Sequence, residues 1–311
     1  RWDKNEAVVL ERNEDYWGDK GVSKEIVFRT ISDNSARVVA LTNGEVDIID
    51  GIDANVVDQI PAAGCLLNMT EGMNINYMAY NTQKLDDPDV RRALSEAVNV
   101  PELVQSLYRG YATEATSILP SFVPGYSADV TQTQYDPEDA QQVLADKGIT
   151  EIHMLAYTNP RPYNTATGQT LAEAIQGYWA KVGVNCRIDT FDWTSYIDKC
   201  NTGDFDVCLF GWTGDNGDPD NFLNLLANED IGINVAHYKN DEYNAMLAEA
   251  VSLPNGDERN ALYGEMEQKL ADECVWLPIS HQESLSAYVS NVHNFIFHPT
   301  GNVYLSKTYK Y

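Results

Sequence analysis

The sequence predicts an α/β protein with about two domains, and three observations support this. The length of 311 residues exceeds what a single compact core usually serves. Apolar runs typical of strands, at 152–157, 185–191 and 205–210, alternate with helix-like segments at 167–182 and 192–201. That alternation is typical of a sheet with a substantial parallel part. The longest apolar runs are far too short to cross a membrane.

The remaining elements follow from periodicity and from capping residues. Asp33 can cap a helix that ends at Gly44, and Asp136 followed by Pro137 marks a second helix start. Pro101 is expected at the first position of another helix. The predicted strands are 6–12, 24–31, 45–50, 73–80 and 276–280, and the other predicted helices are 54–60, 88–98, 101–107, 241–251 and 257–273.

This order of elements predicts one discontinuous lobe and one continuous lobe. Residues 1–72 and 283–311 are assigned to part of lobe one, and residues 73–282 to lobe two. The last thirty residues contain short strands rich in Tyr, Val and Phe, and we expect them to complete the sheet begun by residues 1–50.

Composition excludes several classes of partner and site. The chain carries 47 acidic and 21 basic residues, and the net charge of −26 repels nucleic acid and anionic lipid. The five cysteines, an odd number, show no zinc-ligand spacing and leave at least one thiol unpaired within the chain. His293 and His298 are five residues apart in a strand-like segment, a poor spacing for one metal. We therefore predict no metal and no cofactor.

The most informative segment is 211–222, GWTGDNGDPDNF, which follows the strand-like run 205–210. Glycines allow sharp turns and close approach to a ligand, and Asp215 stands just past the expected strand end, where α/β sheets present ligand-binding groups. A carboxylate beside Trp212 suits a free amine. The alternative is a turn whose Asp and Asn side chains bond only their own backbone. An EF-hand is excluded because Gly and Glu are missing from its required positions.

A second segment, 159–164, NPRPYN, also follows a strand-like run. Arg161 lies between two prolines, which hold the backbone stiff and extended. A guanidinium placed in this way suits a carboxylate, although a surface ion pair is the alternative. An amine site and a carboxylate site in one lobe are what a zwitterionic ligand requires.

Both segments resemble those of dipeptide-binding proteins of bacterial ABC importers, within the peptide/nickel solute-binding protein family 5. Segments 10–18, 35–49, 72–84 and 135–148 are also similar to family elements. The resemblance covers essentially all 311 residues but only the C-terminal portion of a family member. It implies a periplasmic-binding-protein-like, two-lobe α/β architecture, with mixed sheets flanked by helices and a first lobe that is incomplete here.

The resemblance implies a function and a ligand site. The protein is expected to bind dipeptides in a cleft between the lobes and to deliver them to ABC permease subunits, outside the cytoplasm or lipid-anchored at the membrane. Asp215 is expected to bind the ligand amine and Arg161 its carboxylate. The other residues expected at the site are Pro162, Tyr163, Trp212, Thr213 and Gly214.

Other functions remain open at this stage. Oligopeptides, haem, nickel complexes or another small solute are alternative ligands, and a surface adhesin or a peptide hydrolase is a different class of function. The sequence contains no G-x-S-x-G, H-E-x-x-H or phosphate-loop pattern. We therefore predict a binding protein rather than an enzyme.

Overall fold

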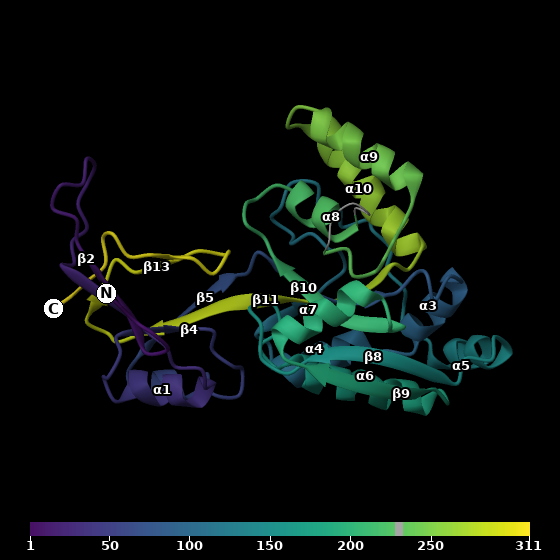
Figure 1. Ribbon diagram of the computed structural model, residues 1–311, viewed down its shortest axis with the longest axis horizontal. Coiled ribbons are helices and arrows are strands. Elements are labelled where there is room, and N and C mark those ends of the chain that lie inside the picture. The colour runs from purple at the N-terminus through teal and green to yellow at the C-terminus, as the bar shows by residue number, and fades with distance from the viewer. Residues whose placement is uncertain (228–232) are drawn as a thin grey trace. The chain divides into compact units, whose positions relative to one another are not determined.

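The structure, a computed structural model, describes residues 1–227 and 233–311 and divides into two compact units (Figure 1). The first unit consists of Arg1–Gly72 and Glu283–Tyr311, and the second of Met73–Gln282. Strand β11 runs from the second unit into the first, and each half pairs with strands of its own unit.

A mixed sheet forms the centre of the second unit. Its strand order is β11-β6-β10-β8-β9, and β7 also pairs with β11. Strands β8, β9 and β10 run parallel, whereas β6 is antiparallel to both of its neighbours. The strands are β6 (Asn74–Tyr80), β7 (Ala112–Glu114), β8 (Glu151–Tyr157), β9 (Asn185–Phe191), β10 (Val207–Thr213) and β11 (Trp276–Tyr288).

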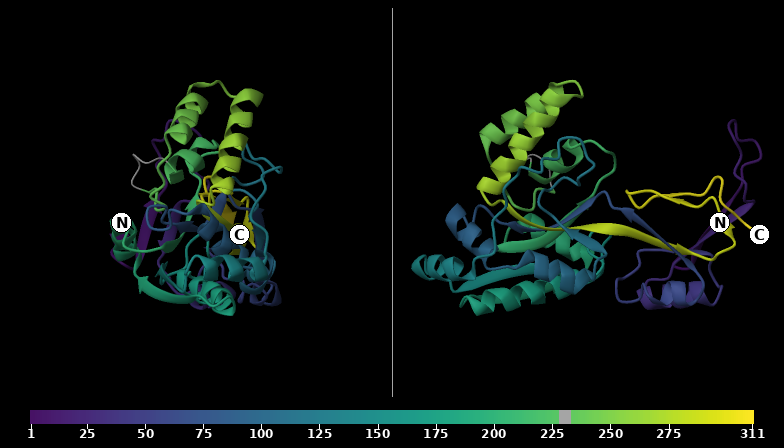
Figure 2. Two further views of the ribbon diagram at one scale, coloured as in Figure 1. Left: turned by 90° about the vertical axis from the view of Figure 1, so that its right-hand side faces the viewer. Right: turned by 180° about the vertical axis from the view of Figure 1, so that it is seen from behind.

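Helices pack around this sheet, and their starts follow the capping pattern of the sequence. The Asp87 carboxylate accepts from the Asp89 amide, and Asp136 accepts from Asp139. Helices α9 and α10 lie side by side as an antiparallel pair (Figure 2). The helices are α3 (Pro88–Glu96), α4 (Val100–Tyr108), α5 (Pro137–Asp146), α6 (Gly168–Lys181), α7 (Trp193–Thr202), α8 (Asp220–Ala227), α9 (Asp241–Ser252) and α10 (Asp257–Asp272).

The core of the second unit is continuous and well covered. Every residue of β6 is buried, because the strand lies inside the sheet. Trp179 on α6 is fully buried and donates from its indole nitrogen to the Leu94 carbonyl at 2.9 Å. Burial of such an aromatic ring contributes much of the stability of a core.

The first unit contains smaller sheets. Strands β1, β2 and β3 form an antiparallel three-stranded sheet, and β4 and β5 each pair with β11. The elements are β1 (Trp2–Asp3), β2 (Ala7–Glu11), β3 (Glu25–Arg29), α1 (Asn34–Thr42), β4 (Ile48–Asp50), α2 (Gln59–Ala62), β5 (Leu66–Glu71), β12 (Val292–His293), β13 (Ile296–Phe297), β14 (Val303–Tyr304) and β15 (Tyr309–Lys310).

Three sequence predictions about these elements were wrong in part. The predicted helix at 54–60 is a series of turns before a shorter α2, because the Asp53 carboxylate accepts from the Asn55 amide. Strand β5 was missed. The C-terminal strands do not complete the sheet of residues 1–50: β12 pairs with β15 and β13 with β14, and only Ser286–Tyr288 of β11 joins β4.

All five cysteines are free and buried. Cys65 belongs to the first unit and the other four to the second. Burial raises the pKa of the Cys186 thiol to about 12, which keeps it protonated and unreactive at neutral pH. The prediction that Cys186 and Cys208 behave as small buried hydrophobes is confirmed.

Candidate functional site

Arg161 lies in the loop between β8 and α6. The loop is closed by two main-chain hydrogen bonds between Arg161 and Asn164, each 2.9 Å long. Asn164 is fully buried and connects the loop to the core. Its Oδ1 accepts from the Tyr108 hydroxyl and its Nδ2 donates to the Tyr157 hydroxyl, both at 2.9 Å. The backbone that carries Arg161 is therefore fixed by side chains of the core.

The guanidinium of Arg161 is half-buried and lacks a counter-ion. Its Cζ lies 3.7 Å from the centre of the Trp193 ring, a cation–π contact that holds the side chain in place. The Nε atom is buried without a hydrogen-bond partner, and no carboxylate of the described residues forms an ion pair with Arg161. The alternative interpretation of Arg161, a surface ion pair, therefore finds no carboxylate partner within the described chain.

Tyr163 packs between this loop and strand β10. Its ring lies directly over Gly211, where an added Cβ would come within 2.3 Å of the ring. Only glycine permits this approach. Burial raises the pKa of Tyr163, and the positive charge of Arg161 opposes that shift. The Arg161 side chain also lies within reach of the buried Tyr163 hydroxyl and favours its ionised form.

The end of β10 differs from the sequence prediction. The strand was expected to stop at 210, but Trp212 and Thr213 belong to it because Thr213 still pairs with Asn74 of β6. Gly214 follows, and its amide donates to the Met73 carbonyl at 2.8 Å. The Thr213 hydroxyl is buried and has no hydrogen-bond partner within the described chain.

Asp215 lies just beyond the strand end, as predicted, and the structure shows that it is exposed. Its amide donates to Asn221 Oδ1 at 2.8 Å, and its Oδ2 accepts from Asn221 Nδ2 at 3.3 Å. The Trp212 indole nitrogen also donates to Asn221 Oδ1, at 3.1 Å. One asparagine on α8 therefore bonds both the carboxylate and the aromatic ring that were predicted to meet the ligand.

Asp218 has a structural role. Both of its carboxylate oxygens accept from Arg259 at 2.9 Å, and Oδ1 also accepts from the Asp220 amide at the start of α8. Partial burial opposes ionisation of Asp218, but the Arg259 guanidinium and the Asp220 amide outweigh it and lower its pKa. This pair fixes the turn between β10 and α8.

The two predicted charged residues of the site, Arg161 and Asp215, follow neighbouring parallel strands. Strands β8 and β10 pair in parallel, so the loops after them leave the same edge of the sheet. Tyr163 connects the first loop to strand β10 through its contact with Gly211. No hydrogen bond or ion pair connects Arg161 to Asp215 among the described contacts, which leaves each charge available to a ligand. Pro162 is exposed in the first loop, between Arg161 and Tyr163.

Three residues of this site were not assigned a role from the sequence. Trp193 follows the cap of α7, and nothing in its local pattern distinguishes it from a core aromatic. Asn164 and Asn221 both lie within the segments that were singled out, and a polar amide in an otherwise turn-forming run was the available signal. Their roles depend on long-range partners that local sequence does not reveal.

Other titratable groups of the second unit belong to different surroundings. Burial raises the pKa of Glu267 on α10 to about 7, although the Ser117 hydroxyl and the Leu119 amide donate to it. The Nδ1 atom of His281 bonds the Asn74 carbonyl at 2.5 Å.

The described residues contain no group of three metal-ligating side chains. None of the helices within 1–227 and 233–311 is long and apolar enough to cross a membrane.

Comparison with curated proteins shows relatives of several ligand classes. The chain is 30% identical over 310 residues to a dipeptide-binding protein of Escherichia coli, covering 97% of this chain and 58% of the relative. It is 31% identical over 312 residues to heme-binding protein A of Haemophilus influenzae, covering 96% and 56%. The chain thus spans rather more than half the length of these relatives. Their names describe binding proteins rather than enzymes.

Solved structures show the same fold. A dipeptide-binding protein of Pseudoalteromonas in complex with Met-Leu gives a TM-score of 0.91 at 24% identity, over 100% of this chain and 63% of that one. The periplasmic binding protein DppA of Helicobacter pylori, in complex with a peptide, gives 0.88 at 27% identity, over 100% and 61%. The predicted mixed α/β fold of two-lobe periplasmic binding proteins is confirmed.

The model of the bacterial extracellular solute-binding proteins, family 5, middle region, matches residues 1–233, which is most of the chain. The predicted resemblance is confirmed, and this chain belongs to family 5 of the bacterial extracellular solute-binding proteins.

Proposed function

We propose that this chain recognises dipeptides, or similar short zwitterionic peptides, as the ligand-binding component of an ABC importer. In this proposal residues 73–282 form the lobe that carries the clamp, and residues 1–72 and 283–311 belong to the other lobe. The protein works outside the cytoplasm and passes its ligand to permease subunits. The names of the relatives and of the structural neighbours support the class of transported solute.

One observation carries the proposal. Arg161 presents a half-buried, ring-stacked guanidinium without a carboxylate partner in the described chain, and the exposed carboxylate of Asp215 leaves the same sheet edge. A ligand with a carboxylate at one end and an ammonium at the other supplies both missing charges. Tyr163, Trp212, Thr213 and Gly214 lie beside or between these residues. Their aromatic and main-chain groups suit a peptide backbone whose side chains vary.

The experiment replaces each charge of the clamp. Asp215→Asn is expected to weaken binding of methionyl-leucine at least tenfold, about 1.4 kcal/mol, because the ligand ammonium loses its counter-charge. The same variant should bind the N-acetylated dipeptide, which has no ammonium, with nearly unchanged affinity. Arg161→Gln should weaken binding of the dipeptide, because the ligand carboxylate loses its counter-charge. It should leave binding of the C-terminal amide, which has no carboxylate, nearly unchanged. Isothermal titration calorimetry on the 311-residue chain measures both.

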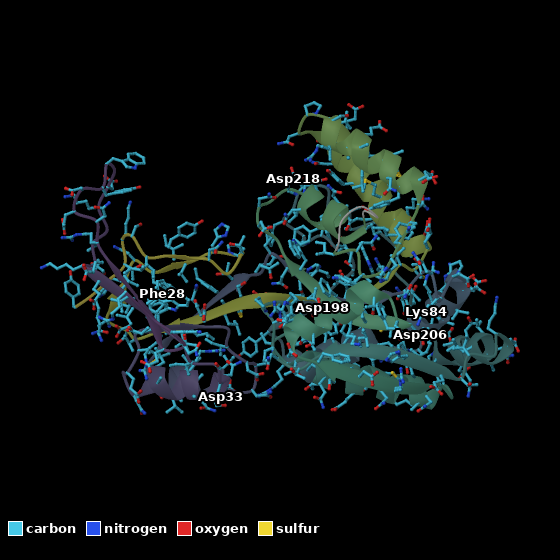
Figure 3. The ribbon with its side chains drawn as sticks, viewed as in Figure 1. Phe28, Asp33, Lys84, Asp198, Asp206 and Asp218 are labelled. Carbon is cyan, nitrogen blue, oxygen red and sulfur yellow. The ribbon has the colours of Figure 1, made fainter. Side chains whose placement is uncertain are left out.

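A matched control removes one acidic charge elsewhere in the same unit. Asp198 on α7 is exposed and forms no hydrogen bond or ion pair among the described contacts (Figure 3). Asp198→Asn should therefore leave the affinity within about twofold, since screening weakens distant charges. Equal losses for free-amine and N-acetylated ligands in Asp215→Asn would contradict the clamp.

Haem is the second candidate ligand, because one relative is named heme-binding protein A. The same chain titrated with haemin distinguishes the two. Saturable haemin binding without dipeptide binding would replace the proposal with that alternative.

A further inference from the structure

Asn221 lies in the first turn of α8 and bonds two residues of the proposed ligand site. Its Oδ1 accepts from the Trp212 indole nitrogen at 3.1 Å and from the Asp215 amide at 2.8 Å. Its Nδ2 donates to Asp215 Oδ2 at 3.3 Å. Within the described part of the chain, Asn221 is the hydrogen-bond partner of the Asp215 carboxylate.

These three bonds require an amide side chain. The carbonyl oxygen has two lone pairs, which serve two donors, and the amino group supplies the donor that a carboxylate needs. An aspartate at this position keeps both acceptor bonds but has no donor for Asp215. An alanine keeps none of them. The chemistry of position 221 is therefore matched to Trp212 and Asp215 together.

The backbone under Asn221 is itself fixed. Asp218 is held by two bonds from Arg259 on α10, and the Asn221 amide donates to the Asp218 carbonyl at 3.1 Å. Phe222 packs against Gly214, where an added Cβ would approach its ring to 2.8 Å. The backbone of Asn221 is therefore held in place by buried contacts. Asp215 and the two residues that follow it are exposed.

From this geometry we infer that Asn221 is a positioning residue that sets the placement of the Trp212 ring and the Asp215 carboxylate relative to each other. The inference rests on the proposed function, because its consequence is selectivity for a free amine. Asn221 donates to Oδ2 of Asp215, so Oδ1 has no hydrogen-bond partner within the described chain and is the freer oxygen to meet an ammonium group. The indole held by the same side chain forms an apolar wall beside it.

The test compares Asn221→Ala, Asn221→Asp and the control Asn224→Ala in the 311-residue chain. Asn224 lies on the same helix and bonds Asp220 instead of Asp215. Each protein is labelled with 5-fluorotryptophan, and Trp212→Phe identifies the Trp212 signal among the six tryptophans by ¹⁹F NMR. Binding of methionyl-leucine and of its N-acetylated form is measured by calorimetry.

Asn221→Ala should shift the Trp212 signal in the absence of ligand and weaken methionyl-leucine binding at least fivefold, with little change for the N-acetylated form. Asn221→Asp should restore the Trp212 signal, since the acceptor oxygen remains. Asn224→Ala should change neither. This pattern is not expected of a residue that only stabilises α8.

Two results separate this inference from the proposed function. If the unmodified chain binds no dipeptide, the proposed function fails, and the ligand-free Trp212 signal still decides whether Asn221 positions the ring. If the unmodified chain binds dipeptide but Asn221→Ala leaves both the signal and the affinity unchanged, the inference is overturned. An equal shift in Asn224→Ala overturns it as well.

Discussion

The two units differ in how completely they bury their apolar side chains. In the second unit, strand β6 is buried throughout and Trp179 has no exposed surface. In the first unit, Trp2 is 74% exposed and Trp17 is 91% exposed. Sheet β1-β2-β3 exposes apolar side chains on both faces, Val8 and Phe28 on one and Val27 on the other. A layer buries its apolar face only when another layer covers it.

Two strands with a similar content of apolar residues can therefore be buried to different extents. Strand β2, AVVLE, is as apolar as many strands of the second unit, yet only Val9 in it is buried. In the second unit α6 and α7 pack against β8 and β9 of the central sheet, whereas in the first unit α1 and α2 contact β4 and β5. We therefore expect the second unit to dominate the stability of this chain, and the first unit to dominate its tendency to associate.

The largest expected effect comes from the same substitution made in both units. Trp179→Ala should lower the free energy of unfolding by about 3–5 kcal/mol, because it leaves a large cavity and an unpaired Leu94 carbonyl. Trp17→Ala should change it by less than about 0.5 kcal/mol, since that ring is exposed. Urea unfolding followed by circular dichroism measures both. Similar losses would show that the first unit is as well packed as the second.

A smaller effect is expected from the buried acid of the second unit. The pKa of Glu267 is about 7 in the folded chain and 4.5 ordinarily, so its proton stabilises the fold below about pH 4.5 and this contribution is lost as pH rises through 7. Glu267→Gln should equal the unmodified chain near pH 4.5 and exceed it by roughly 2–3 kcal/mol at pH 8.

The control for this prediction is Glu265→Gln, which removes an exposed acid from the same helix. It should give a small difference that does not grow with pH. Urea unfolding of the three proteins from pH 4.5 to pH 8 provides the measurement. A constant gap between Glu267→Gln and the unmodified chain across that range would rule out titration of Glu267 as the cause.

The smallest effect on stability concerns the exposed face of β2 and β3. Val8 lies opposite Phe28, which Figure 3 labels, in the register of the two strands. Both side chains are exposed. We expect this apolar face to cause self-association. The double variant Val8→Lys, Phe28→Glu should reduce the mean mass in light scattering towards that of a monomer, while stability changes by less than about 0.5 kcal/mol.

Val251→Lys provides the comparison in the second unit. Val251 is 56% exposed on α9, and a single apolar residue on a covered unit should contribute little to association. A monodisperse unmodified chain at high concentration would contradict the role assigned to the first unit.

The sequence predicted most elements of the second unit because local chemistry marks their ends. Asp136 and Pro137 start α5, and β9 lies where its apolar pattern places it. Strand β11 is the exception, since it continues past the predicted end at 280. Ser280 and Gln282 are polar but buried, and the Gln282 side chain donates to the Ser280 hydroxyl. Asn74 bonds both main-chain groups of Gln282. Partners distant in sequence make this strand possible, and hydrophobicity alone does not indicate it.

The sequence predicted the two charged residues of the candidate site but not the side chains that contact them. Arg161 and Asp215 were recognised from strand ends, prolines and glycines, which are local signals. Trp193 beneath Arg161 and Asn221 beside Asp215 depend on how α7 and α8 pack. The sequence therefore predicts which charged groups a ligand would meet, whereas the structure shows which side chains contact those groups.

All five thiols are buried, and both units contain at least one, so the reactivity of each thiol can report local unfolding of its own unit. A thiol reagent reacts only with molecules in which a buried cysteine becomes transiently accessible. Cys65 reports on the first unit, and Cys208, within strand β10, reports on the centre of the second. The ratio of the labelling rates of Cys65 and Cys208 would therefore compare how often each of the two units opens within one polypeptide.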